Sequence, residues 1–192
     1  MKRVFLTLTL GLAFALAGCI TQQYDSQGNP IGRAALEREL VTDTGGRIIA
    51  RPTHLIPPDR MIINGNTPTE RGIRLLGGEG VSRDKAPTTY AKSQEWMAKY
   101  VAEEDEIYIK PALNTDLKQR VIYGIVYLRA VDEDTGREIP GGYVNVNMAM
   151  LSQGLVRTRD LREIEDAGLR ERMQAAEDYA RRERLGLWSG DP

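Results

Sequence analysis

The sequence of 192 residues has little of three things on which many protein sites depend: one cysteine, one histidine and no excess of basic residues. With Cys19 alone, the chain can form no internal disulfide and no cysteine-based metal site. With His54 alone, neither a usual zinc site nor a Ser/His/Asp triad is expected, and we predict a surface or loop position for it among prolines. The 26 Lys and Arg residues against 27 Asp and Glu give no general attraction for nucleic acid, whose binding rests mainly on phosphate contacts.

Long apolar runs are also scarce. The one at the N-terminus, Val4 to Ala17 after Met1-Lys2-Arg3, is too short to span a membrane comfortably and is typical of a signal segment. It ends in Leu16-Ala17-Gly18-Cys19, which resembles the bacterial lipobox, where the cysteine becomes the lipid-bearing first residue. We therefore predict a lipoprotein signal peptide over residues 1–18 and lipidation of Cys19. The alternative is an ordinary secretory signal with Cys19 as a bystander.

Lipidation would decide where the protein resides. Several acyl chains, each contributing roughly 0.8 kcal/mol per buried methylene, would hold the protein on a membrane almost permanently. We predict a membrane-anchored protein of the bacterial cell envelope, and Ile20 in place of Asp is compatible with the outer membrane in a Gram-negative source. Loss of Lys2 and Arg3 leaves 24 basic and 27 acidic residues, a net charge of −3. Residues 19–46, which are polar and glycine-containing, are predicted to be a tether before a domain at 47–192.

Periodic patterns in this domain predict strands and helices. Apolar and β-branched runs indicate strands at 59–65, 72–76, 107–109 and 121–128, with a hairpin turn at 132–136 returning through 143–144. Helices are predicted from a threonine-capped start at 87–89 to 102, from 145 to 153, and over a final stripe of Leu169, Met173, Ala176 and Ala180. In the first helix, Ser93, Met97, Tyr100 and Val101 are expected to face the core.

The candidate site lies in residues 72–82. A strand carrying Arg74 runs into a glycine-rich turn that holds Glu79, and glycines there allow positive backbone dihedrals. If the preceding strand pairs with it through the turn at Asn64, Asp59 comes close to Arg74. The alternatives are a purely structural turn with a solvated Glu79, and a solvated Asp59 at the start of a strand.

Two segments resemble the staphylococcal nuclease-like family. Residues 146–156, Val-Asn-Met-Ala-Met-Leu-Ser-Gln-Gly-Leu-Val, are similar to its second helix, and 176–189 to its closing helix and tryptophan. The order and spacing of the elements extend the resemblance over roughly residues 47–190. It implies an α+β fold, a five-stranded OB-type barrel packed with three α-helices.

The same resemblance implies a calcium-dependent phosphodiesterase site. Arg74 matches the family's strand arginine and Asp59 its upstream metal-binding aspartate, while the second arginine falls on Arg120 or on the better-aligned Val121. The family's Asp-x-Pro-Glu turn is replaced by Glu79-Gly80-Val81-Ser82, so Glu79 takes the place of a metal aspartate and Ser82 that of a water-activating glutamate. Where family members often have tyrosines, this sequence has Arg159-Asp160-Leu161-Arg162.

Three functions follow from these residues. The leading hypothesis is a membrane-anchored thermonuclease-like lipoprotein with a degenerate site, which binds a partner in the envelope, such as a protein. The alternative is an active, calcium-dependent nuclease that cleaves DNA or RNA with Arg74, Asp59, Glu79 and Arg120 in a rearranged site. The third is a structural lipoprotein without a ligand.

Overall fold

The computed structural model describes residues 23–24, 30–31, 45–102, 104–132, 135 and 137–190. The chain divides into two units, residues 1–35 and 36–192. In the first unit, β1 (Gln23–Tyr24) pairs antiparallel with β2 (Pro30–Ile31). The predicted signal peptide and Cys19 lie outside the described residues. Within the part of the chain that is described, no helix is long and apolar enough to cross a bilayer.

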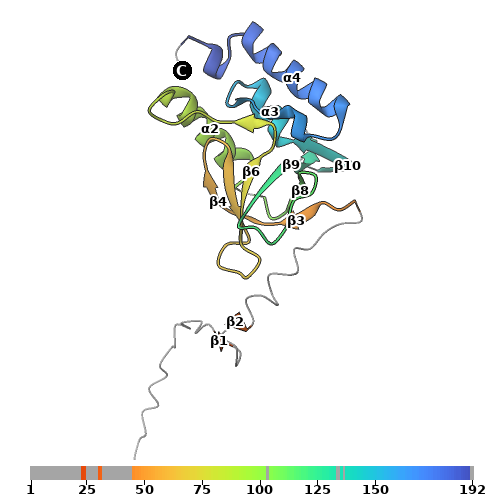
Figure 1. Cartoon of the computed structure of the whole chain (residues 1–192). Helices are drawn as coiled ribbons and strands as arrows, with labels where there is room; N and C mark the ends of the chain where they lie inside the picture. The colour runs from red at the N-terminus through yellow and green to blue at the C-terminus, as the bar shows by residue number, and fades with distance from the viewer. Residues whose placement is uncertain are drawn as a thin grey trace, which may run out of the picture. The chain divides into compact units, whose positions relative to one another are not determined.

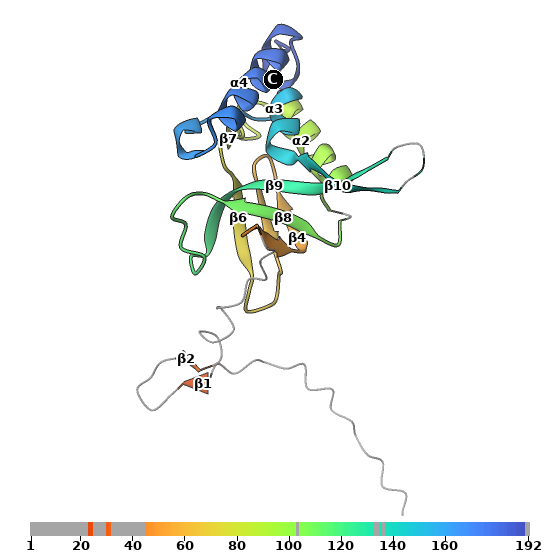
Figure 2. The same ribbon diagram turned by 90° about the vertical axis from the view of Figure 1, so that its right-hand side faces the viewer.

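The second unit is built on one mixed sheet, shown in Figures 1 and 2. Its strand order is β3-β8-β9-β6-β5-β4, and β10 pairs with the far half of β9. Neighbouring strands are antiparallel except β6 and β9, which are parallel. The strands are β3 (Ile48–Ala50), β4 (Pro52–Ile56), β5 (Arg60–Ile63), β6 (Arg71–Leu75), β8 (Ile107–Pro111), β9 (Val121–Val131) and β10 (Glu138–Asn145).

The expected five-stranded OB-type barrel packed with three helices is therefore confirmed only as an α+β fold with a sheet and three helices. The sheet has seven strands in the described residues and is open, because its end strands β3 and β4 do not pair with each other. β9 is long enough to pair with β6 at its start, β8 in its middle and β10 at its end. β9 thus pairs with three other strands, and the local sequence pattern does not predict which strands these are.

The alternation of buried and exposed side chains along β6 determines which face of the sheet carries Arg74. Ile73 and Leu75 point into the core, and Gly72 and Arg74 lie on the opposite face. β5 has the same pattern, with Met61 and Ile63 buried. Because side chains alternate across a strand, burial of the apolar set fixes Arg74 on the outer face of the sheet.

The described residues form three α-helices, which Figure 2 shows grouped at one end of the sheet. They are α2 (Pro87–Tyr100), α3 (Val146–Ser152) and α4 (Ala167–Arg182). Asn145 caps α3 by accepting from the Met148 amide, as predicted, and Asp166 caps α4 in the same way. The predicted threonine cap of α2 is wrong: Pro87 begins the helix, no side chain caps it, and the buried Thr89 hydroxyl has no partner.

A buried asparagine connects the helices to the end of β6. The Asn147 amide donates to the carbonyls of Leu76 (2.8 Å) and Gly124 (3.2 Å), and its oxygen accepts from the Val126 amide (2.9 Å). Asn147 is fully buried, so these bonds replace the water it has lost. The point at which the chain leaves β6 toward Glu79 is therefore held from inside the domain.

Candidate functional site

Asp59 is buried directly before β5, next to the pairing of β5 with β6. Its side chain is 6% exposed, and one carboxylate oxygen, Oδ2, lies 3.3 Å from Nη2 of Arg74. The other oxygen, Oδ1, lies 3.4 Å from Nε of Arg60, and the Gly80 amide donates to Oδ2 at 3.4 Å. The predicted proximity of Asp59 and Arg74 is confirmed, and the alternative of a solvated carboxylate is wrong. Arg60 faces Arg74 across the two strands, so Asp59 also reduces the repulsion between them.

Tyr123 is the residue opposite Arg74 on the parallel strand β9. Arg74 Nη1 donates to the Tyr123 hydroxyl at 3.2 Å, and the guanidinium carbon lies 5.5 Å from the ring centroid. Burial alone would lower the pKa of Arg74, but the charge and hydrogen bond of Asp59, together with Tyr123, raise it. Arg74 is thus held as a cation between a carboxylate and a phenol.

Arg120, the predicted second arginine, lies just before β9. Its side chain is exposed, and its carbonyl accepts from the Gly72 amide at 2.7 Å. The place beside Arg74 belongs to Tyr123, three residues further along the chain. The catalytic role of Arg120 stays a prediction, and the register between β6 and β9 gives it no support.

Glu79 lies in a small ladder separate from the main sheet. β7 (Gly78–Glu79) pairs antiparallel with β11 (Arg157–Thr158), with Glu79 opposite Arg157. Oε2 of Glu79 accepts from Arg157 at 2.8 and 3.2 Å, and Oε1 accepts from Nη1 of Arg159. The hydrogen bond from Arg157, aided by Arg159, holds the pKa of Glu79 below its usual value although burial opposes this.

The contacts of Arg157 and Arg159 with Glu79 were not predicted from the sequence, in which Arg159 was noted only in the segment that replaces the family's tyrosines. Their spacing of two, which puts both on one side of a short strand, was the signal that could have found them. Thr158, between them, points to α4 instead, where its hydroxyl donates to the buried Glu177 at 2.6 Å. One side of the β11 segment therefore binds α4, and the other side places two arginines beside Glu79.

A cavity of about 270 Å³ lies between Arg74 on the sheet and Glu79 on the small ladder. Arg74 and Tyr123 line it from the sheet, and Glu79, Arg159 and Asp160 line it from the small ladder. Glu163 adds a third carboxylate, so two guanidinium groups face three acids. Such a lining does not favour a polyanion. Ser82 does not line this cavity; its carbonyl accepts from the amides of Lys85 and Ala86 before α2.

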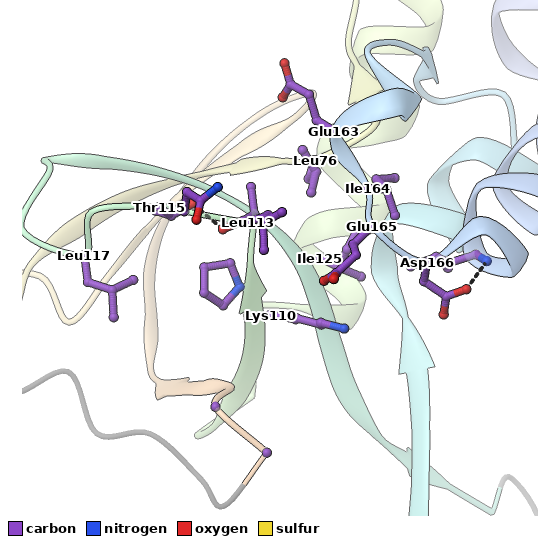
Figure 3. A pocket seen from close by; sticks show the side chains of 16 residues that line it. Leu76, Lys110, Leu113, Thr115, Leu117, Ile125, Glu163, Ile164, Glu165 and Asp166 are labelled. Atoms are coloured by element: carbon purple, nitrogen blue, oxygen red, sulfur yellow. Dashed lines mark hydrogen bonds between the residues drawn. The ribbon is translucent and has the colours of Figure 1, made fainter.

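A larger cavity of about 330 Å³ lies nearby, between the segment around the end of β8 and the segment that leads into α4. Figure 3 shows its lining side chains coming from two sides: Lys110, Leu113, Thr115 and Leu117 on one, and residues 163–166 on the other. Buried Leu76, Ile125, Ile164 and Leu169 are also among its lining residues. Leu76 and Glu163 line both cavities, so the two share a wall.

The comparison with known families agrees with the fold. The model of the family described as Staphylococcal nuclease homologue matches residues 79–190, which is more than half of the chain. The chain belongs to this family. The match begins at Glu79, so Asp59 and Arg74 lie before the matched range of the nuclease homologue. No curated protein matches the sequence.

Membership in the nuclease homologue family makes calcium the metal to test against these residues. Calcium takes six to eight oxygen ligands, usually with several carboxylates. Within the described residues, no group of three or more His, Cys, Asp or Glu side chains could hold a metal ion. Asp59 and Glu79 belong to different clusters, and each carboxylate is bound by two arginines. The residues present do not fit a calcium ion.

Proposed function

We propose that this nuclease homologue is a lipid-anchored protein of the bacterial envelope that binds a partner and does not hydrolyse phosphodiesters. The observation that carries the proposal is the pairing of Glu79 with Arg157 and Arg159. By resemblance, a metal-binding carboxylate belongs at that position. Here the carboxylate is neutralised by protein cations.

The other residues of the candidate site also argue against phosphodiester hydrolysis. Ser82 has no carboxylate with which to activate water, and loss of acid/base assistance costs about 100- to 10,000-fold in rate. Beside Arg74 lies Tyr123 and not a second arginine, and loss of one charge-stabilising donor costs roughly another 100-fold or more. A neutral phenol donates a hydrogen bond but brings no positive charge.

Charge argues against one class of partner. The site cavity has no excess of positive charge, and the net charge of −3 after signal removal also disfavours nucleic acid. A protein of the envelope is the partner we propose, reached from the membrane through the lipid on Cys19. In a Gram-negative source this would be the outer membrane.

One observation favours the alternative, an active calcium-dependent nuclease. Arg74 keeps its contact with Asp59 and lines an accessible cavity, which is where a strand arginine of the family would meet a phosphate. In that case Arg74→Ala should abolish cleavage.

The deciding experiment is cleavage of fluorescent single- and double-stranded DNA and of RNA by the purified mature protein. Each substrate is tested with calcium and with chelator, beside Arg74→Ala and Glu79→Ala. We expect no cleavage above the level of the Arg74→Ala protein under any condition. Calcium-dependent cleavage that both substitutions remove would establish the nuclease instead.

The partner is sought by crosslinking in intact cells, with Cys19→Ser as the control that removes the anchor. A specific protein that is crosslinked only to the anchored form supports the binding role. Crosslinking to no specific protein would favour a structural lipoprotein without a ligand.

A further inference from the structure

We propose that Arg157 and Arg159 are a built-in cation that takes the place of a metal at Glu79, keeps divalent ions out and joins the site turn to β11. This inference deepens the proposed function and rests on it. It assigns these two arginines a role at the site that does not depend on any substrate.

The first argument is that the carboxylate oxygens are already occupied. Oε1 of Glu79 is bound by Arg159 and Oε2 by Arg157, while Oδ1 of Asp59 is bound by Arg60 and Oδ2 by Arg74. All four oxygens of the two candidate metal ligands therefore have a guanidinium partner. A calcium ion would have to displace arginines that cannot be neutralised by losing a proton.

The second argument is that the backbone holds the two arginines in place. Arg157 is opposite Glu79 in the ladder, and the Arg159 amide donates to the Gly77 carbonyl at 3.1 Å. Between them, Thr158 is bound through its amide and its hydroxyl to Glu177 of α4. Because β11 is fixed on both sides, Arg157 and Arg159 return to Glu79 at little entropic cost, although their side chains are about half exposed.

The third argument is the shape of the turn. Gly77 has φ +73°, and a side chain there would meet Ile164 and Met173 at less than 3 Å. The turn is thus packed against the segment that leads into α4, and Glu79 is aimed at β11. With the turn fixed in this way, Glu79 and Asp59 are directed to separate arginine pairs.

The test is metal binding by the full chain in detergent. Terbium luminescence and calcium-dependent thermal unfolding are measured for the wild type and for Arg157→Gln/Arg159→Gln. The wild type should show no saturable terbium signal and no calcium-dependent shift. Removing two positive charges beside the carboxylate should give a saturable signal, with binding at least about tenfold tighter at low salt than the limit measured for the wild type.

Arg137→Gln/Arg182→Gln is the matched control, since it removes the same charge from exposed positions that do not contact Glu79. This control should behave as the wild type. Adding Glu79→Gln to the Arg157/Arg159 variant should abolish the gain, which places the metal at Glu79. If the double variant does not fold, as judged by circular dichroism, the exposed Arg159→Gln alone is used and should show part of the gain.

Two results would overturn the inference: saturable calcium binding by the wild type that depends on Glu79, or no gain of metal binding in any folded arginine variant. Neither outcome is decided by the cleavage experiment. A protein that neither cleaves nucleic acid nor gains metal binding would keep the proposed function and lose this inference.

Discussion

Asp59 and Glu79 carry the same charge and each has two arginine partners, but the two clusters are built differently. Asp59 is buried between adjacent strands of the main sheet, and a backbone amide also donates to it. Glu79 is 22% exposed and lies on a ladder only two residues long. The comparison shows two ways of holding a carboxylate with two arginines, one beside adjacent strands of the main sheet and one on a short ladder near the surface.

The largest loss of stability is expected when Asn147, which holds the end of β6 between the two clusters, is replaced. Asn147→Ala removes three buried hydrogen bonds and leaves the Leu76 and Gly124 carbonyls and the Val126 amide with fewer partners. We expect a loss of about 3 kcal/mol in the free energy of unfolding, measured by urea denaturation. Asn145→Ser, which keeps a capping side chain on the neighbouring residue, is the control and should cost little. A loss below about 1 kcal/mol would show that the end of β6 is held by other contacts.

A smaller loss is expected when the buried cluster is broken. Asp59→Ala leaves Arg74 without its carboxylate and Arg60 opposite it, so we expect about 2 kcal/mol of destabilisation in the same denaturation measurement. Replacing the exposed partner instead, by Arg60→Ala, should cost about 0.5 kcal/mol. Equal losses for the two variants would mean that Asp59 is no more strongly coupled than a surface ion pair.

The smallest loss of stability is expected at the Glu79 cluster, and it should depend on pH. The folded-state pKa of Glu79 is lowered by its hydrogen bonds to Arg157 and Arg159, so the unfolded chain binds the proton more readily. The stabilisation is therefore present above the usual pKa of 4.5 and is lost as pH falls through the lowered value. We expect wild type to exceed Glu79→Gln by about 1 kcal/mol or less near pH 7, in denaturation curves taken across pH. A difference that does not shrink on acidification would contradict the ion pairing.

The sequence predicted elements well where the signal is local. The antiparallel pair before and after Asn64, the Asn145 cap and the glycine after α3 all appear in the structure, because each depends on residues close together in the chain. Ser93 and Met97 of α2 and Val101 just after it are buried as expected, but Tyr100, the last residue of the helix, is 43% exposed. His54 is exposed as predicted, although it lies on β4 and not in a loop.

The site was predicted in part. Arg74 and Asp59 come together as expected, because Asp59 comes directly before β5 and Arg74 lies on β6, the other strand of the same hairpin. Tyr123, Arg157 and Arg159 were not identified, since their contacts depend on a parallel register between β6 and β9 and on the two-residue ladder between β7 and β11. Such pairings join residues 49 to 80 positions apart, and no local pattern records them.

The three-residue pairing of β3 with β8 has a mechanical consequence. Ile48, Ile49 and Ala50 are the only residues through which β3 joins the sheet, and β3 is the first strand of the main sheet. Tension applied to the chain ahead of residue 47 would load the contacts of Arg47 with Tyr143 and this short ladder before it reaches β5 or β6. If the protein is anchored as proposed, this ladder is the part of the main sheet that a pull toward the membrane would load before the strands that hold Asp59 and Arg74.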